Sequence, residues 1–140
     1  MKMTNYTLVN LVNELGSFMN KRLPQKISYA ITRNVILATN EYKIYETQVN
    51  KIMEKYSDHM VKDESGNLKI NDAGIPEVEE AVKKEYYEKL AELLNVEIDI
   101  NIYTIDESAF NYEDNEKYDN LSPNEIIQLQ SILCLKGENS

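Results

Sequence analysis

The most constraining feature of this sequence is a seven-residue hydrophobic repeat that continues for more than three heptads. Its members follow one another at alternating steps of four and three residues: Ile31, Val35, Ala38, Tyr42, Tyr45, Val49, Ile52 and Tyr56. Such a repeat places all its members on one face of an α-helix, as in the seam of a coiled coil. No proline or glycine occurs between Gln25 and Val61, so the pattern predicts one long helix over residues 24–60. At about 1.5 Å per residue this helix would exceed roughly 50 Å, and we expect it to need a long helical partner.

Three further segments carry helical signals. Residues 7–22 repeat apolar side chains at helical spacing, namely Leu8, Leu11, Val12, Leu15, Phe18 and Met19, which predicts a short opening helix. Pro76 suits the first turn of a helix, and we expect a helix over 76–95. This helix is the expected antiparallel partner, with Tyr42, Tyr45, Val49 and Ile52 facing Val78, Val82, Tyr86 and Leu90. The sequence Ser122-Pro123-Asn124-Glu125 is typical of a capped helix start and predicts a last helix over 122–134.

The remaining segments predict turns and one strand. Residues 61–75 contain two turn sequences, 63–67 and 71–74, and are expected to form a turn or small hairpin. Residues 96–103 alternate apolar and polar side chains, which is typical of a half-buried strand. Its pairing partner is expected to be either 68–70 or a second copy of the chain. Residues 104–121 read as an acidic loop. The predicted fold is a single, mainly α domain over 1–140: a long antiparallel helical hairpin with a short N-terminal helix, a small β element and a C-terminal helix.

The composition argues against most catalytic and metal chemistry. With one histidine, His59, and one cysteine, Cys134, the common zinc clusters are excluded. The four glycines form no phosphate-binding loop. We expect His59 to help satisfy a helix C-terminus and Cys134 to be an inert buried thiol between two leucines. The chain is therefore expected to have no catalytic residues, no metal site and no cofactor, and not to be an enzyme.

Charge is distributed unevenly along the chain. The net charge is −9, and residues 1–60 hold eight Lys and Arg against five Asp and Glu, whereas residues 61–140 hold seven against nineteen. Phosphate backbones require positive potential, so direct nucleic-acid binding is not expected. The acidity favours either a basic partner or simple solubility. The lone cysteine and the lack of a long apolar run predict a soluble, cytoplasmic protein with no membrane segment.

Two surfaces are candidates for partner binding. Residues 106–120 interleave aromatic and acidic side chains, and the aromatic ones either fold back onto the helices or anchor a partner whose basic surface the carboxylates steer. The candidate residues there are Phe110, Tyr112, Glu113, Asp114, Glu116, Tyr118 and Asp119. The alternative is a basic patch with Tyr29 among its members: Lys21, Arg22, Lys26 and Arg33. This patch could hold a phosphate or an acidic peptide, or it could be a solvated helical corner.

Several segments resemble a known group of proteins. The segments are Leu8–Asn13, the motif Leu23-Pro24-x-Lys26-x-Ser28-Tyr29-Ala30-Ile31-x-x-Asn34, Leu93–Ile100 and Leu121–Ile126. In these segments the chain resembles a family of small phage and prophage proteins of low-GC Gram-positive bacteria that carry an unknown-function label. The shared motifs mark structural features such as helix starts and turns and contain no catalytic pattern. The acidic segment 106–120 is longer here than in the family's pattern. The resemblance implies a phage origin and no particular activity.

Together these observations predict a non-catalytic, phage-encoded binding protein that acts on a host protein in the cytoplasm, for example as an inhibitor of host defence. The alternative is an accessory protein in virion or tail assembly, which would use the long helix for self-association. A symmetric homodimer is also expected, because the long helix carries apolar residues on more than one flank and the predicted strand lacks an obvious partner.

Overall fold

The computed structural model describes residues 1–112 and 117–134, and helices dominate it. The predicted helix-dominated fold, with its long helix, short N-terminal helix, small β element and C-terminal helix, is confirmed. The elements in chain order are β1 (Lys2–Thr4), α1 (Asn5–Gly16), α2 (Gln25–Lys55), the 3-10 helix η1 (Ser57–His59), α3 (Glu80–Leu94), β2 (Glu97–Asp99), the 3-10 helix η2 (Glu107–Phe110) and α4 (Pro123–Leu133).

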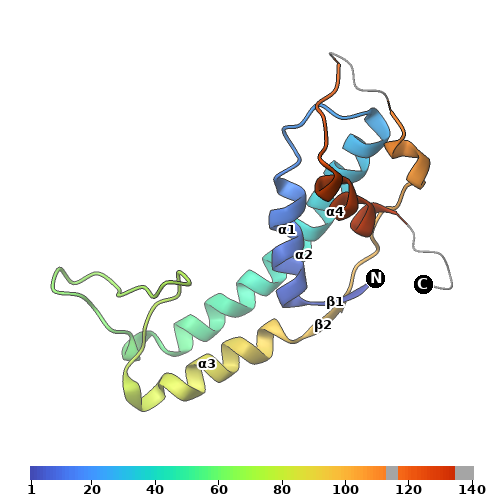
Figure 1. Ribbon diagram of the computed structural model, residues 1–140. Helices are drawn as coiled ribbons and strands as arrows, with labels where there is room; N and C mark the ends of the chain where they lie inside the picture. Colours follow the sequence, from blue (N-terminus) through green and yellow to red (C-terminus); the bar gives the residue numbers. More distant parts are fainter. Residues whose placement is uncertain (113–116, 135–140) are drawn as a thin grey trace.

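Helix α2 runs the length of the molecule and is covered by different helices along its two halves (Figure 1). Helix α1 lies beside the first half and α3 beside the second half. The expectation of one long partner is therefore wrong, because α3 has only 15 residues against 31 in α2. Two short helices share the length of α2, and the molecule has a bent outline (Figure 1).

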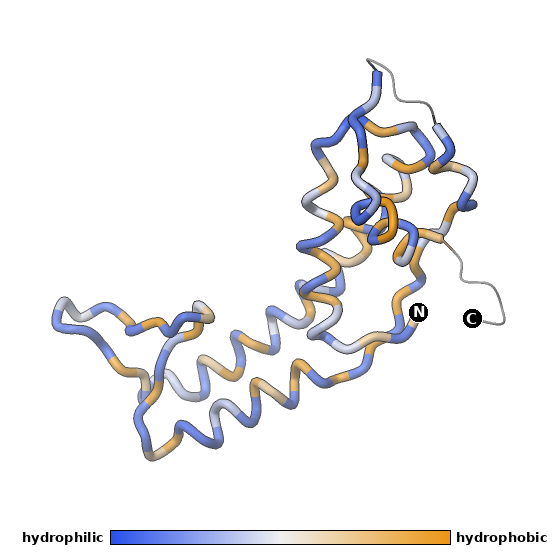
Figure 2. Tube along the Cα trace, viewed as in Figure 1, coloured by the Kyte–Doolittle hydropathy of each residue, from blue (hydrophilic) through white to orange (hydrophobic). Residues whose placement is uncertain are grey.

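The main core cluster joins α1, the first half of α2, η2 and α4. Figure 2 shows apolar residues gathered where these elements meet. The buried members are Met3, Leu8, Leu11, Leu15, Phe18, Leu23, Ile27, Ala30, Ile31, Ala38, Ile100, Phe110, Leu129 and Leu133. Most of the apolar face predicted for the opening helix is therefore buried, although α1 ends at Gly16, well before the expected end at residue 22. Phe18 reaches the core from the turn that follows, whereas Met19 stays exposed.

A smaller distal cluster lies between the second half of α2 and α3. Tyr56, Val78, Tyr86 and Leu90 are its buried members, and Val49, Ile52 and Val82 pack against them. The predicted pairing therefore applies to the C-terminal half of the repeat. It is wrong for Tyr42, which packs on the main core cluster, because α1 and not α3 covers that part of α2.

Helix α3 begins at Glu80 rather than at Pro76. Residues 75–79 are extended instead, since their backbone groups pair with the chain that leaves α2: Glu79 N donates to His59 O at 2.8 Å and Val61 N donates to Glu77 O at 3.0 Å. Pro76 has no N–H to donate, and its carbonyl accepts a 3.1 Å hydrogen bond from the Tyr86 hydroxyl. Pro76 therefore lies in an extended edge segment and not in the first turn of α3, because it needs no hydrogen-bond partner for its nitrogen.

Residues 60–79 form a small meander that projects from the far end of α2 (Figure 1). Three short extended pieces meet through the bridges Met60↔Val78, Lys62↔Leu68 and Ile70↔Pro76. Lys69 connects all three, since its N–H donates to Val61 O and its carbonyl accepts from Glu77 N. Residues 68–70, proposed as a mate for the predicted strand, are therefore used inside the meander.

The predicted strand over 96–103 is shortened to β2, and its partner is the N-terminal strand β1. The two strands are antiparallel, with Met3 opposite Ile98. The observed partner is a segment for which the sequence predicted no element, so the pairing expected with 68–70 is wrong, and pairing with a second copy of the chain stays a prediction. The alternation holds for Ile98, Ile100 and Ile102, which pack on the main core cluster, while Val96 remains exposed.

Candidate functional site

The aromatic residues of the acidic segment fold back onto the protein. Phe110 is 8% exposed and belongs to the main core cluster. Tyr112 is half-buried, its hydroxyl donates to Asp119 O at 3.2 Å, and its ring meets Tyr118 edge-on at 5.6 Å. Phe110 and Tyr112 therefore adopt the folded-back arrangement, one of the two alternatives considered for them, and a role in partner binding stays a prediction. Glu113, Asp114 and Glu116 lie outside the described residues.

The two surfaces proposed from the sequence contact each other. Two hydrogen bonds join Arg22 to Asp119. Arg22 N donates to Asp119 Oδ2 at 2.7 Å, and Asp119 N donates to Arg22 O at 2.7 Å. The Arg22 guanidinium adds a contact of 3.1 Å to Asp119 Oδ1, and Lys21 Nζ lies 3.5 Å from Glu125 Oε2. These two basic side chains therefore have counter-ions within the chain, and the binding role predicted for Lys21, Arg22 and Asp119 stays a prediction.

These contacts also lower the pKa of the carboxyl groups involved. The backbone and side chain of Arg22 hold the pKa of Asp119 below its usual value. For Glu125 the backbone N–H of Ser122 is the main cause, with Lys21 as a further one. Hydrogen bonds from Ser108 lower the pKa of Asp106, and Lys26 adds to the effect. All three side chains are therefore firmly ionised near neutral pH.

Arg33, the remaining arginine of the basic patch, lies among exposed aromatic rings. Its Nη1 donates to the Tyr29 hydroxyl at 3.0 Å, and its Cζ lies 5.0 Å from the Tyr103 ring centroid and 6.0 Å from that of Tyr29. The two rings meet edge-to-face at 5.4 Å. Tyr29 is 51% exposed and Tyr103 37% exposed. We call Tyr29, Arg33 and Tyr103 the tyrosine–arginine cluster.

A buried asparagine fixes the position of Tyr103. Asn34 is fully buried in α2, its Nδ2 donates to Tyr103 O at 2.8 Å, and its Oδ1 accepts from Tyr103 N at 2.7 Å. The Asn34 side chain thereby pairs with the main chain as a neighbouring strand would. Because this clamp uses only the backbone of Tyr103, the ring is free to project beside Arg33.

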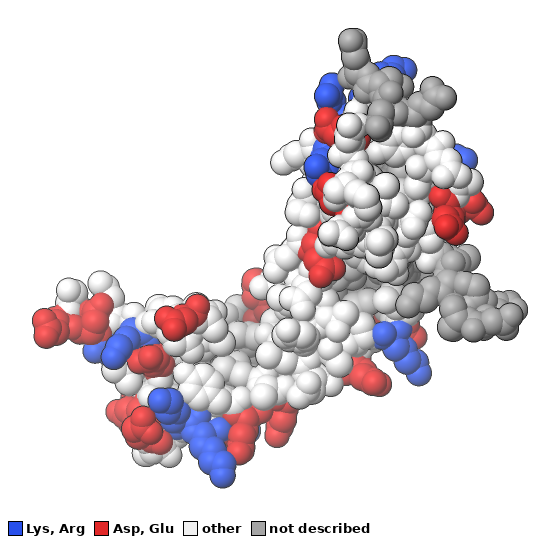
Figure 3. Space-filling model, in the orientation of Figure 1, with Lys and Arg blue, Asp and Glu red and all other residues white. Residues whose placement is uncertain are grey.

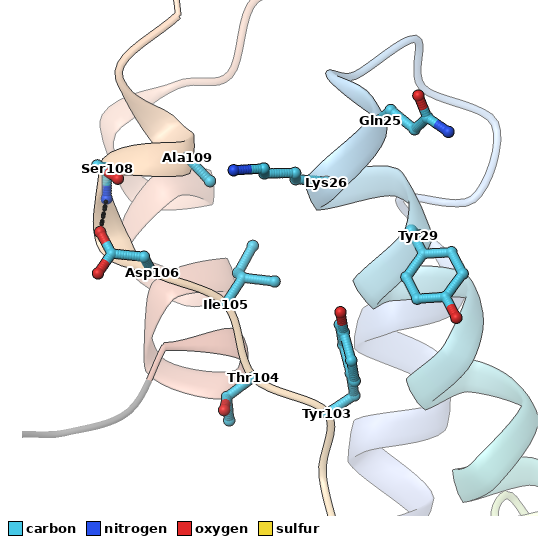
Figure 4. A pocket seen from close by; sticks show the side chains of 9 residues that line it. All are labelled: Gln25, Lys26, Tyr29, Tyr103, Thr104, Ile105, Asp106, Ser108 and Ala109. Carbon is cyan, nitrogen blue, oxygen red and sulfur yellow. Dashed lines mark hydrogen bonds between the residues drawn. The ribbon is translucent and has the colours of Figure 1, made fainter.

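A cavity of about 430 Å³ opens next to the cluster, between the start of α2 and residues 103–109 (Figure 4). Its lining residues are Gln25, Lys26, Tyr29, Tyr103, Thr104, Ile105, Asp106, Ser108 and Ala109. In Figure 4 the Lys26 side chain reaches across the cavity toward Ala109, and the Tyr103 ring points into it. Asp106 is turned toward Ser108, whose N–H donates to it at 2.8 Å. The volume lies within the usual range for ligand pockets.

A second cavity, of about 360 Å³, lies in the bend between α1, α2, α3 and the 71–75 turn. Tyr6, Tyr42, Tyr45, Val49 and Leu90 are among the side chains that line it. Burial, and next the neighbouring Tyr42, raises the pKa of Tyr45. This cavity is mainly apolar and its one acidic side chain is Glu46.

The single histidine and the single cysteine lie far apart. His59 lies in η1 at the distal end of α2, where its Nδ1 is 3.3 Å from Glu79 Oε2. Cys134 follows α4 at the other end of the molecule (Figure 1), and burial, with Glu107 and Asp106, raises the pKa of its thiol. Within residues 1–112 and 117–134, no three His, Cys, Asp or Glu side chains are grouped as a metal site would need. In the same part of the chain, no helix combines the length and hydrophobicity needed to cross a bilayer.

Charged side chains are unevenly distributed over the surface. On the face shown in Figure 3 they gather around α3 and the 60–79 meander, while the middle of the part built from α1 and α4 carries few.

Sequence reasoning grouped Tyr29 with the basic patch but missed Tyr103 and the cavity. The available signal was the absence of any acidic residue between Glu14 and Glu41, a long interval in so acidic a chain.

Comparison with known proteins leaves the relationship of the chain open. It matches no family model, no curated protein and no solved structure. The resemblance to the phage and prophage family therefore stays a prediction that rests on the motifs quoted above.

Proposed function

We propose that this protein is a non-catalytic binding protein and that the tyrosine–arginine cluster is the centre of its binding face. Tyrosine and arginine are among the residues most often found at the energetic centre of protein–protein interfaces. Tyr29, Arg33 and Tyr103 are held together by ring contacts and a hydrogen bond, yet remain exposed. A side chain that is already ordered loses less entropy on binding. This preorganised, exposed cluster is the observation that carries the proposal.

The partner that we propose is a host protein, in line with the phage family that the sequence resembles. The binding would take place in the cytoplasm of the host, for example as inhibition of a defence protein. Such a role requires a surface and no reacting groups. The position of His59 in η1 and of Cys134 directly after α4 is in keeping with it.

An affinity capture from host lysate tests this proposal. The native chain is compared with Tyr103→Ala and Tyr29→Ala, each first shown by circular dichroism to be folded. Tyr6→Ala serves as the control, since Tyr6 is an exposed tyrosine on α1, at 60%, outside the cluster. We expect the native chain and Tyr6→Ala to retain one host protein in a fixed ratio and the cluster variants to lose it. Equal capture by all four chains would refute the assignment of the face, and capture of virion or tail proteins in ordered oligomers would favour the assembly role instead.

A further inference from the structure

Arg33 has most of its hydrogen-bonding capacity free for a ligand. A guanidinium carries five N–H donors in a planar fork. One of the Arg33 donors goes to the Tyr29 hydroxyl, and the two tyrosine rings hold the group in place. The fork is therefore positioned before a ligand arrives. A carboxylate suits it best, because its two oxygens accept two parallel hydrogen bonds.

Arg33 differs in this respect from the other arginine of the basic patch. Arg22 is paired with Asp119 at 3.1 Å and Lys21 with Glu125 at 3.5 Å. In the described part of the chain, no carboxylate lies within 4.0 Å of the Arg33 guanidinium. In a protein of net charge −9, an arginine without a carboxylate partner leaves a local positive charge that a partner can neutralise.

The surroundings of Arg33 limit the ligand to one or two negative charges. Lys26 lies two helical turns before Arg33 on the same face of α2 and contributes the amine at the edge of the cavity. Asp106, on the opposite wall, and the acidic character of the chain as a whole would repel a polyanion such as a nucleic acid. The cavity also offers Ile105, Ala109 and the face of Tyr103 to an apolar side chain.

We propose that the tyrosine–arginine cluster binds an acidic peptide segment of the partner, with an aspartate or glutamate carboxylate on Arg33 and a neighbouring apolar side chain in the cavity beside Lys26. This inference rests on the proposed function and specifies its chemistry. A single carboxylate next to an apolar group matches the charge of Arg33, the two rings and the volume of the cavity. An unstructured or extended segment of a protein can supply both groups at adjacent positions.

A display library of random short peptides, selected on the full native chain, tests the inference. The tightest peptide is then labelled with fluorescein, and its affinity is measured by fluorescence anisotropy. Its acidic residue is changed to the matching amide, and the protein is changed by Arg33→Gln, so that the two changes form a double-mutant cycle. Lys43→Gln is the control, because it removes one exposed positive charge from the same helix outside the cluster. A single-stranded oligothymidine is the nucleic-acid probe.

We expect selected peptides to carry an acidic residue beside an apolar one. The amide change should weaken binding to the native chain and to Lys43→Gln by about tenfold or more, because it removes a charge-assisted hydrogen bond, and should leave binding to Arg33→Gln nearly unchanged. Peptides that require Tyr103 but contain no acidic residue would overturn this inference and leave the proposed function standing. Peptides that bind Tyr29→Ala and Tyr103→Ala as well as the native chain would overturn both. A library that yields no binder, or an oligothymidine that binds more tightly than the best peptide, would also overturn the inference.

Discussion

Two buried asparagines show how single polar residues set the tertiary structure here. Asn34 clamps the backbone of Tyr103, and Asn5 donates from Nδ2 to Leu93 O at 2.9 Å. Each of them ties an N-terminal helix to a segment far along the chain. Hydrophobic periodicity assigns such a residue no role, because a polar side chain on a helix is expected to face water. Asn34 stood out in the sequence only as one position of the family motif.

We expect Asn34→Ala to destabilise the protein strongly. The substitution leaves the Tyr103 N–H and C=O without partners, and each unmade buried hydrogen bond costs about 1–3 kcal/mol. Urea denaturation followed by circular dichroism gives the free energy of unfolding. Asn40→Ala, at an exposed position of the same helix, should change it little. Equal effects of the two substitutions would show that the clamp contributes nothing.

Tyr56 and Tyr86 form a matched pair within the distal cluster. Their rings meet edge-to-face at 5.3 Å, and the Tyr86 hydroxyl donates a well-formed hydrogen bond to Pro76 O, whereas in the described part of the chain the buried Tyr56 hydroxyl has at most a weak contact with Glu85. We therefore expect Tyr86→Phe to lower the free energy of unfolding by about 0.5–1.5 kcal/mol and Tyr56→Phe to leave it unchanged or raise it. Thermal melts of both variants at neutral pH provide the measurement.

The same pair predicts a response to alkaline pH. Burial, together with the nearby Glu85, raises the pKa of Tyr56 to about 12, above its ordinary value of 10.0. Because the folded state retains the proton longer than the unfolded chain, stability should be lost as the pH rises from about 10 to about 12. Tyr56→Phe should lose less stability over this range than the native protein. An identical loss in both would assign the alkaline sensitivity to other groups.

At the scale of elements, the two turns of the meander show local sequence acting alone. Asp63 Oδ1 accepts from Ser65 N and Asn67 N, and Asn71 Oδ1 accepts in the same way from Ala73 N and Ile75 N. In both turns a glycine three residues later adopts a positive φ, 83° at Gly66 and 78° at Gly74. An Asp or Asn followed at this spacing by glycine therefore specifies each turn without help from the rest of the fold.

Substitution of these glycines should separate conformation from packing. Among the described residues, apart from the adjoining backbone, no heavy atom lies within 4 Å of a Cβ placed at Gly16, Gly66 or Gly74, so none of the three alanine variants meets a clash there. Gly66→Ala and Gly74→Ala should each cost about 1 kcal/mol because of the positive φ. Gly16→Ala, at the end of α1, should be neutral or stabilising. Hydrogen exchange at the Lys69 amide, together with thermal melts, would reveal the difference, and equal behaviour of all three variants would contradict it.

The pairing of α2 with α3 can be tested at its centre. Ile52 packs on the distal cluster, and burial of a large apolar side chain contributes roughly 1.5–3 kcal/mol. Because Ile52 is partly buried, Ile52→Asp should remove a substantial share of that stability, as measured by urea denaturation. Ile44→Asp, at a 60% exposed position of the same helix, is the control and should have a small effect. An unchanged melting temperature for Ile52→Asp would refute the packing described here.

At the scale of the whole molecule, the uneven charge of the chain is partly balanced internally. Segments of the acidic second half lie on the basic corner of the first, through Arg22 with Asp119 and Lys21 with Glu125. The charge difference that suggested a basic partner therefore also serves the fold. Arg33 stands apart from this internal pairing, which is why it becomes the centre of the proposed site.

Acid should detach the C-terminal segment from this corner. The pKa values of Asp106, Asp119 and Glu125 are lowered in the folded state, so their contribution to stability is present above the unfolded values near 4 and is lost as the pH falls below them. In a pH titration by NMR, the amide of Asp119 should lose protection while amides in the middle of α2 keep theirs. Asp119→Asn should show less protection at neutral pH already. Simultaneous loss at all amides would mean that the segment does not open independently.

The sequence by itself determined the features that depend on neighbours along the chain. The heptad repeat specified α2, the capping box of Ser122 and Glu125 specified the start of α4, and the Asp and Asn turns specified the ends of the meander. All of these depend on interactions within a few residues or on the period of one helix. The alternation of apolar and polar residues over 96–103 likewise indicated the strand, although β2 is shorter than predicted.

Only the tertiary structure decided which segments meet. Residues distant in sequence meet where β2 pairs with β1 and where α1 and α3 each cover part of α2. The contact of Asp119 with Arg22 and the placement of Tyr103 beside Arg33 also join such residues. Periodicity indicates which face of an element is apolar, but several faces are equally hydrophobic and could pair in more than one combination. The choice among them depends on the close packing and hydrogen bonding of the whole chain, and the proposed site is assembled by that choice.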